Sequence, residues 1–508
     1  LSTNGGTNWT NYQVAGTGGL FYGDPAMTFD HGGYAYFSFL GYSAICTPQG
    51  GMYVSRSTDS GATFLPPVQL AQNTGGGLYT NFQDKEYVAV DTNPSSPYSG
   101  TVYVGWTKFV FVGGTNCTQQ YAAPVVLSRS TDHGISWSEP ITASQPISNN
   151  NQGTVPVIGL NGDVYLYYVG AATQTQLNYD SVLFSRSTDG GQTFPIFKRV
   201  ADIVDLPSPL PPTNFRNNPF GAMAADKQIP GYLYAVWADY RNGDADILMV
   251  TSTDSGNTWT APRRVNDDPI SNGKDQFFPW ITASTDGSIH VGWFDRREDA
   301  VNRSYKEYYT VSYDHGLTWE PNIAISTAAS NPGNSGFIGD YSGLAAVDGV
   351  VIPTWTDIRA GTNQNAYIAR GVYSAGPTIT PAPTSTATIP PTATATSTSA
   401  ATSTRTATAT SIPSSTPTAC TIQFTDVLPG STFYDFVRCL ACRGIINGYT
   451  TGCETGNPCF KPNANVTRGQ LSKIVSNAAG FSEPAGAQQF EDVLPGSTFY
   501  DFVWRLAS

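Results

Sequence analysis

Short stretches of alternating apolar and polar residues recur through the first three quarters of the chain. One series comprises YLYAVWADY at 232–240, DILMVTSTD at 246–254 and, after a glycine-containing turn, TWTAPRRV at 258–265. Alternation with period two indicates half-buried strands, and the Gly, Asn, Asp and Pro residues between them indicate tight turns. The pattern therefore predicts a mainly β region over residues 1–375.

A polar turn centred on aspartate repeats within this region. SRSTDSGATF at 55–64 returns four times in related form, and LSTNGGTNW at the N-terminus is a degenerate copy with Asn4 in place of the aspartate. The intervals of about 55 to 73 residues suit one four-stranded propeller blade. In such a turn the carboxylate accepts backbone N–H groups and the glycine takes a positive φ. We therefore expect a structural role for Asp59, Asp132, Asp189, Asp254 and Asp314.

The turn motif S/T-x-D-x-G-x-T-W/F resembles the Asp box of sialidases and related propellers. The resemblance implies that the boxes lie at the periphery, on the turn between the third and fourth strands of each blade. The strands expected at about 340–347, 349–355 and 365–373 have no box after them, whereas the N-terminal stretch has a box without earlier strands. Joining the two ends predicts a sixth blade and hence a six-bladed β-propeller.

The remainder of the chain divides into two further regions. Residues 376–419 consist almost wholly of Pro, Thr, Ser and Ala, which predicts an extended, disordered linker. In residues 420–508, FTDVLPGSTFYDFV (424–437) returns as FEDVLPGSTFYDFV (490–503). Near identity over that length indicates duplication of a whole structural unit.

The third region resembles the S-layer homology repeat. Its F-x-D-V opening is followed by RGIINGYTTG (443–452) and by a helix start within PNANVTRGQ (462–470), as in that family. The resemblance implies a small α-helical domain, one full repeat and the start of a second, that binds cell-wall polysaccharide. It also implies an extracellular location on a bacterial surface, with Arg468 in an anionic-glycan pocket. The alternative is that Arg468 merely caps or solvates its helix.

Charge narrows the classes of partner. The formal net charge is −12 and the pI is about 4.7, with no basic stripe along the chain. Nucleic acid and acidic membrane surfaces are therefore disfavoured as partners. No apolar run approaches the roughly 20 residues needed to span a bilayer, so membrane insertion is not expected.

The seven cysteines lack histidine neighbours in metal-ligand spacing, which favours disulfides in an exported protein. Cys453 and Cys459 bracket a short loop that a disulfide would close. Cys46 and Cys117 fall in loops of adjacent early blades, where either a disulfide or two reduced cysteines is possible. No metal and no cofactor are predicted.

Candidate catalytic residues follow from the sialidase resemblance. The nucleophilic tyrosine of that family lies in a Y-S-x-L stretch, which GDYSGLA matches at Tyr341. The expected R-I-P triplet reads Gly23-Asp24-Pro25, and the glutamate that would activate the tyrosine is missing from RNNPFGAMAAD. Without a neighbouring base a tyrosine keeps a pKa near 10. Asp24 and Glu86 are the carboxylates expected to replace the missing acidic residues of the family, if they reach the same opening of the propeller as Tyr341.

Candidate substrate-binding arginines lie on the loops expected opposite the Asp boxes. Three of these loops read Trp-x-Asp-x-Arg, and a ring of guanidinium groups suits a carboxylate-bearing sugar. The alternative is that each arginine pairs with the aspartate of its own loop. Arg303 matches another carboxylate-binding position of the sialidases. The candidate set is Arg241, Arg297, Arg303 and Arg359.

The leading functional hypothesis is a cell-surface-anchored, sialidase-like propeller that acts on glycans as a glycoside hydrolase. The missing family residues favour a rival, a non-catalytic propeller that binds glycan or protein in adhesion. The wall-binding repeat alone would also permit a purely structural surface-layer component.

Overall fold

The computed structural model describes two parts of the chain. The first is residues 1–374, with gaps at 13, 15–19, 44–46, 76–78, 113–118, 146–149, 172–178, 348 and 362. The second is the segments 424–427, 434–449, 458–461, 466–479 and 492–507, with scattered single positions. The two compact units are Leu1–Thr386 and Ala387–Ser508. The predicted linker, 376–419, lies outside the described residues, and the domain boundaries at 375 and 420 stay predictions.

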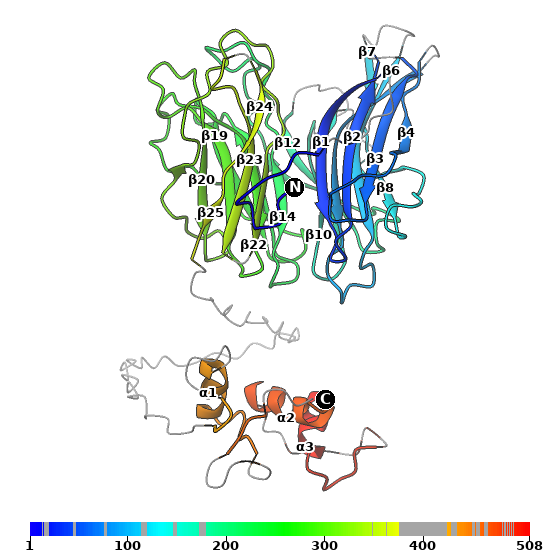
Figure 1. Cartoon of the computed structure of the whole chain (residues 1–508), viewed down its shortest axis with the longest axis vertical. Helices are drawn as coiled ribbons and strands as arrows, with labels where there is room; N and C mark the ends of the chain where they lie inside the picture. The colour runs from blue at the N-terminus through cyan, green and yellow to red at the C-terminus, as the bar shows by residue number, and fades with distance from the viewer. Residues whose placement is uncertain are drawn as a thin grey trace, which may run out of the picture. The chain divides into compact units, whose positions relative to one another are not determined.

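The first unit is a six-bladed β-propeller, which confirms the predicted fold class (Figure 1). In four of the sheets each strand pairs antiparallel with the next strand in the chain, and the second and sixth sheets depart from this order at one strand each. The first blade comprises β1 (Phe21–Phe29), β2 (Ala35–Tyr42), β3 (Gly50–Ser57) and β4 (Val68–Gln72). The second comprises β5 (Tyr79–Val90), β6 (Val102–Val112), β7 (Gln119–Ala122), β8 (Val125–Ser130) and β9 (Ile141–Thr142). The third comprises β10 (Asn151–Ile158), β11 (Val164–Gly170), β12 (Ser181–Ser187) and β13 (Ile196–Asp202).

The remaining three blades follow the same order. The fourth comprises β14 (Ala222–Ala225), β15 (Leu233–Asp239), β16 (Asp246–Ser252) and β17 (Arg263–Arg264). The fifth comprises β18 (Gln276–Ala283), β19 (Ile289–Asp295), β20 (Lys306–Ser312) and β21 (Ile323–Ala324). The sixth comprises β22 (Gly343–Val347), β23 (Val350–Asp357), β24 (Asn365–Ile368) and β25 (Gly371–Val372), with both β24 and β25 paired to β23.

The five Asp boxes use their carboxylates within their own turns. In the first, Ser57 Oγ donates to Asp59 and accepts the Gly61 N–H, while Asp59 accepts the N–H and the hydroxyl of Thr63 at 2.8 and 2.6 Å. The hydroxyl bond, ahead of the backbone bond, lowers the pKa of Asp59 to about 2. The same bonds recur at Asp132, Asp189, Asp254 and Asp314.

The N-terminal stretch closes the ring with a turn of the same kind. Ser2 Oγ accepts the Gly6 N–H at 2.8 Å and Asn4 Oδ1 accepts the Asn8 N–H at 2.9 Å. Arg370, between β24 and β25, donates to the Gly5 carbonyl at 2.7 Å, which ties the turn to the sixth blade. The predicted last strand is not formed among the described residues 9–12, which are exposed and have little to gain from pairing.

The innermost strands of four blades carry a β-bulge at matching positions. The pairing register shifts after Gly23, Asp84, Gln152 and Phe277. The residue that follows each shift has a positive φ of 56°, 55°, 70° and 51°, in turn Asp24, Lys85, Gly153 and Phe278. Three of these are not glycine, so the conformation costs energy and is held by its surroundings. Bulges redirect side chains, and two of the four bulge residues, Asp24 and Lys85, are charged.

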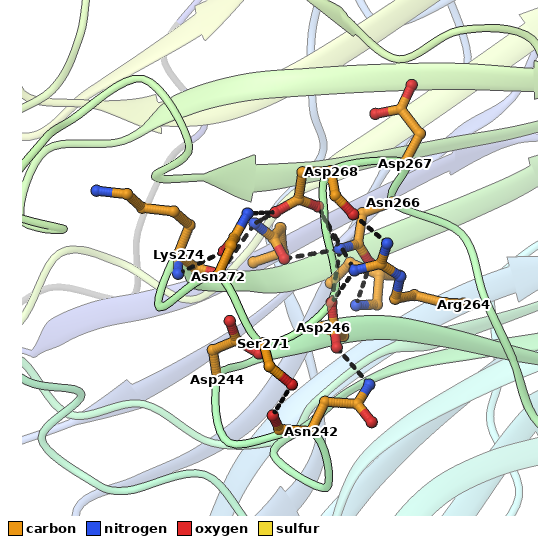
Figure 2. A network of polar contacts seen from close by, with 12 residues as sticks. Asn242, Asp244, Asp246, Arg264, Asn266, Asp267, Asp268, Ser271, Asn272 and Lys274 are labelled. Carbon is orange, nitrogen blue, oxygen red and sulfur yellow. Dashed lines mark hydrogen bonds and ion pairs between the residues drawn. The ribbon is translucent and has the colours of Figure 1, made fainter.

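A polar network ties the fourth blade to the fifth (Figure 2). At its centre Asn266 Nδ2 donates to Asp246 at 2.7 Å, to Asp268 at 2.7 Å and to Gln276 at 2.8 Å. Asn266 Oδ1 accepts the Ile247 N–H at 2.9 Å. Asn266 is buried, and its amide links acceptors from the fourth blade to one in the fifth, Gln276.

The second unit is helical, with α1 (Tyr434–Cys442), α2 (Arg468–Ala479) and α3 (Tyr500–Ala507). Its core comprises Phe424, Val427, Val437, Ala441 and Ile446. Cys453 and Cys459 form the predicted disulfide, with an S–S distance of 2.03 Å. Cys46 and Cys117 lie outside the described residues. Across the described part of the chain, no helix has the length and apolar character needed to cross a membrane.

Candidate functional site

A cavity of about 940 Å³ opens on the propeller axis. Its walls come from the beginnings of β1 and β5, the ends of β2 and β23, and the segment 337–343. The Asp boxes follow the third strands, which run in the same direction as the first strands. They therefore lie at the face where the first strands end, opposite the cavity, as expected from the alternation of turns.

Three aspartates gather in and beside this cavity around one buried lysine. Lys85 Nζ lies 3.5 Å from Asp340 Oδ1, and the lysine side chain is only 3% exposed. Arg216 Nη2 lies 3.2 Å from Asp340 Oδ2. Asp24 and Asp84 line the same cavity, and Asp84 Oδ2 accepts a bond from Gln152 Nε2 at 3.0 Å. Asp340 thus forms two ion pairs. Among the described residues, neither Asp24 nor Asp84 forms an ion pair.

Burial and mutual repulsion raise the pKa values of two of these groups. Burial raises the pKa of Asp24, and Asp340 adds to the rise, against the opposing effects of Lys85 and a hydrogen bond with Tyr341. Burial, and then the charge of Asp24, raises the pKa of Asp84 to about 7. A carboxyl group that keeps its proton near neutral pH is able to act as a general acid.

Tyr341 lies in the cavity wall as a neutral phenol. Burial raises its pKa well above the ordinary range, and the charges of Asp24 and Glu86 add to that rise. Its hydroxyl donates to the Glu86 backbone carbonyl at 3.5 Å, and its ring stacks on Tyr87 with centroids 5.0 Å apart. Lys85 Nζ lies 4.0 Å from the centre of the ring. The arrangement favours hydrogen-bond donation over nucleophilic attack by a phenolate.

Glu86 does not line the cavity, in contrast to the expectation that it would reach the mouth beside Tyr341. It is 0% exposed, and neither carboxyl oxygen has a hydrogen-bond partner among the described residues. Burial raises its pKa well above the usual range, ahead of the charge of Asp24. The bulge at Lys85 brings the backbone carbonyl of Glu86, rather than its side chain, to Tyr341.

The protonated state of Glu86 should make stability depend on pH. Because its pKa is higher in the folded protein, its contribution is complete below about pH 4 and is lost as pH rises, at up to about 1.4 kcal/mol per pH unit. Glu86→Gln, which cannot titrate, should gain stability relative to the original chain as pH increases from about 4.5 to 7.5. Urea unfolding followed by tryptophan fluorescence at four pH values measures this. Parallel profiles would contradict a buried, protonated Glu86.

The structure does not bring the predicted arginines to the cavity, which corrects the expected arginine ring. Arg241, Arg297 and Arg359 each bind the aspartate two residues earlier, at 2.7, 2.8 and 2.6 Å. The tryptophan of each motif donates to the same aspartate. Arg303 donates to the Gly333 carbonyl at 3.3 Å and is not in the cavity wall. Each motif arginine reaches the aspartate of its own loop at little entropic cost. The alternative that each arginine pairs within its own loop therefore applies.

The sequence interpretation missed Arg216, Asp84, Lys85 and Asp340 as site residues. Each lies within a stretch that had been considered, in RNNPFGAMAAD, FQDKEYVAVD or GDYSGLA. For Asp84 and Lys85 the signal that could have identified them is a charged pair in the middle of the innermost strand β5. Arg216 and Asp340 lie in the segments before β14 and β22, where a charged residue is ordinary and gives no such signal. No group of three or more His, Cys, Asp or Glu side chains placed to hold a metal ion occurs within the described ranges.

Comparison with solved structures gives matches to the propeller. A Hadza microbial sialidase is 17% identical, with 69% of this chain and 65% of that chain covered and a TM-score of 0.44. A protein of unknown function from Dyadobacter fermentans is 15% identical, with 71% and 97% covered and a TM-score of 0.46. The NanB sialidase from Streptococcus pneumoniae is 12% identical, with 71% and 69% covered and a TM-score of 0.44. The chain thus spans less than two thirds of the first of these proteins.

Comparison at the sequence level identifies the second unit. No curated protein matches the chain significantly. The family model described as "S-layer homology domain" matches residues 423–472, which include α1 and the start of α2 with Arg468. This family indicates attachment to a bacterial cell surface. The chain therefore carries an S-layer homology domain at 423–472 together with a six-bladed β-propeller.

Proposed function

We propose that the axial cavity binds and hydrolyses glycans, and that the S-layer homology domain attaches this activity to cell-wall polysaccharide outside a bacterial cell. The observation that carries the proposal is the gathering of Asp24, Asp84 and Asp340 in an aromatic-walled cavity, in environments that differ in charge. Carboxyl groups whose environments separate their protonation states are the usual means of glycoside hydrolysis.

The roles follow from the surroundings of each group. Asp24, whose pKa is raised by burial, donates a proton to the glycosidic oxygen as the leaving group departs. Asp340, held by Lys85 and Arg216, is the carboxylate that attacks the anomeric carbon or activates a water. The Tyr341 hydroxyl, which lies near both the Glu86 carbonyl and Asp24, orients the Asp24 side chain. The aromatic rings of Tyr22, Phe337 and Trp280 provide walls for the apolar faces of sugar rings.

The proposal is tested by incubating the full chain with a panel of aryl glycosides and oligosaccharides and recording product release. Proton NMR of the first product then reports the anomeric configuration. Retention indicates carboxyl groups about 5 Å apart, with Asp340 as nucleophile, and inversion indicates a wider separation with a water between them. Binding without turnover on any member of the panel would refute hydrolysis and favour the adhesion propeller.

Asp84 should set the alkaline limit of this activity. The charge of Asp24 raises the pKa of Asp84, and because two carboxyl groups in one site repel each other when both are ionised, this coupling is reciprocal. The activity of the original chain should fall as pH rises and the acid loses its proton, and Asp84→Asn should move that alkaline limb to lower pH. The kcat/KM profile from pH 4 to 9, recorded for the original chain and for the variant, measures the alkaline limb of each. An unmoved alkaline limb would show that Asp84 is not coupled to the catalytic acid.

Arg468 should contribute to wall binding. It begins α2, is exposed and lies within the matched S-layer homology segment. Arg468→Ala should weaken binding of the full chain to isolated cell-wall polysaccharide about tenfold, as expected for one charge-assisted hydrogen bond. Lys473→Ala removes the same charge from the same helix and is the control. Equal losses for both variants would indicate a general charge effect instead.

A further inference from the structure

We infer that the cavity takes an interior stretch of a polysaccharide chain, which lies in a slot between the first and sixth blades. The inference rests on the proposed glycan site and narrows its substrate to polymers that are bound and cut away from their ends. Hydrolysis there adds water across an internal glycosidic bond and releases two shorter chains.

The cavity extends sideways from the axis between these two blades, whose strands β1 and β23 both line it (Figure 1). The second and fifth blades line it with innermost strands alone, β5 and β18. The sixth blade lines it also with Thr354 and Thr356 on the second strand, β23, and with Ala366 on the third, β24. Blades that pack face to face bury these outer strands, so they line a cavity only where two blades stand apart. The volume, about 940 Å³, is near the upper limit of the usual range for ligand sites, roughly 300–1,000 Å³.

The innermost strands of the two blades are separated in the same way. At every other junction neighbouring innermost strands pack together, from β1 with β5 to β18 with β22, whereas β22 and β1 make no comparable contact among the described residues. Apolar side chains on the facing sides are therefore exposed, Met27 by 48% and Val347 by 52%. Leu344, which points the other way on β22, is buried against the fifth blade. The exposed face of the sixth blade is thus a wall of the slot.

The two walls of the slot differ in chemistry, and each suits one part of a sugar ring. On the first blade the Tyr22 ring packs edge-on against Phe39, with centroids 5.7 Å apart, so this wall is aromatic. On the sixth blade Thr354 and Thr356 point to the same side as Ala366, because Thr356 pairs with Ala366 and the residues of a strand alternate. Aromatic rings pack against the C–H faces of sugars, and threonine hydroxyls bond to the polar groups at their edges. The slot therefore matches a glycan along its length.

The N-terminal turn closes the slot at the Asp-box end. Ile352 of β23 packs against Gly6 in that turn. Leu1 and Phe29 lie together beside Gly61, at the Asp box of the first blade. The turn thus bridges the two blades where β1 ends, and the slot is open toward the face on which the cavity opens. A chain that enters from that face lies along the slot with both of its ends outside the protein.

Methionine oxidation tests whether the slot is open in solution. Of the four methionines, Met27 lies on the slot wall and is exposed, whereas Met52, Met223 and Met249 are at most 4% exposed. Brief treatment of the folded full chain with hydrogen peroxide, followed by peptide mass spectrometry, should oxidise Met27 faster than the others by about tenfold or more, because exposure governs the rate. Equally slow oxidation of all four would show that the two blades pack together and would overturn the inference.

Binding stoichiometry tests whether the ligand is a chain interior. The probes are polygalacturonic acid, xylan and polysialic acid, each as a short and a long fraction of known length, with the Asp24→Asn variant so that they are not cut. Sedimentation should show more protein bound per chain as the chain lengthens, and the bound polymer should protect Met27 from peroxide. A pocket for chain ends would instead hold one protein per end at any length. That result, an unprotected Met27 in the complex, or no binding to any of the three polymers would refute the slot.

A pair of variants tests the path of the chain. Ala366→Trp fills the outer part of the slot and should weaken binding of the polymer about tenfold more than binding of a trisaccharide of the same sugar. Ile323→Trp, the control, adds the same ring to an exposed position on β21 and should not change that ratio. Equal losses for polymer and trisaccharide in Ala366→Trp would contradict a chain that runs past β24.

Thermal unfolding of each variant checks that it is folded, and protection of Met27 in the original chain decides the question if one is not. Because these are binding measurements, a protein that holds polymer in the slot but releases no product would refute hydrolysis alone.

Discussion

Replacing Asp24 with asparagine should lower kcat/KM for glycoside hydrolysis by at least about 1,000-fold, within the range known for loss of a general acid. Asparagine keeps the size of the side chain but has no proton to donate to the leaving oxygen. The loss should be smaller for aryl glycosides with good leaving groups, which need less protonation. Steady-state rates on one phenyl and one dinitrophenyl glycoside measure both effects.

The control for this variant is Asp202→Asn, the same chemical change at the end of β13 on a side chain that is 78% exposed. Its kcat/KM should stay within twofold of the original chain. An Asp24→Asn variant that retains activity, or that loses it equally for both leaving groups, would contradict the assignment of Asp24 as the acid.

Replacing Asn266 with aspartate should lower the free energy of unfolding by about 2–4 kcal/mol at pH 7, as is usual when a buried network gains an unpaired charge. The buried Asn266 amide donates to Asp246 and Asp268, and in the variant a carboxylate oxygen would face both. Urea unfolding followed by tryptophan fluorescence measures the loss.

Asn257→Asp is the matched control, since Asn257 is exposed and its amide donates to a backbone carbonyl in its own turn. Its effect should be within about 1 kcal/mol. Equal effects at the two positions would mean that the network in Figure 2 is not a stabilising link between the fourth and fifth blades.

The fold could be predicted because its determinants are local. Each Asp box is completed within about eight residues, from Ser57 to Thr63 in the first, so the motif fixes a turn wherever it appears. The intervals between the turns then give the blade number. The same reasoning placed the Asn4 turn correctly, but not the strand after it, because pairing of residues 9–12 depends on packing that a turn motif does not report.

The site was less predictable because its residues are brought together from separate blades. Tyr341 and Asp24 were identified and do line one cavity, whereas Glu86, named on the condition that it reached the same opening, is buried and does not line it. A bulge beside Lys85 changes which neighbouring group faces the cavity, and strand alternation does not reveal such a shift. For the motif arginines the sequence left two alternatives open, a ring around the axis and pairing within each loop, and the observed ion pairs agree with the second.

The central claim is that glycan binds in the axial cavity opposite the Asp boxes. It is tested most directly by a crystal structure of the Asp24→Asn variant with the oligosaccharide that it binds most tightly. The account predicts sugar density between Tyr22, Phe337 and Trp280, with the glycosidic oxygen facing residue 24 and the anomeric carbon facing Asp340. Sugar bound on the Asp-box face or along the outer strands, with the axial cavity empty, would contradict it.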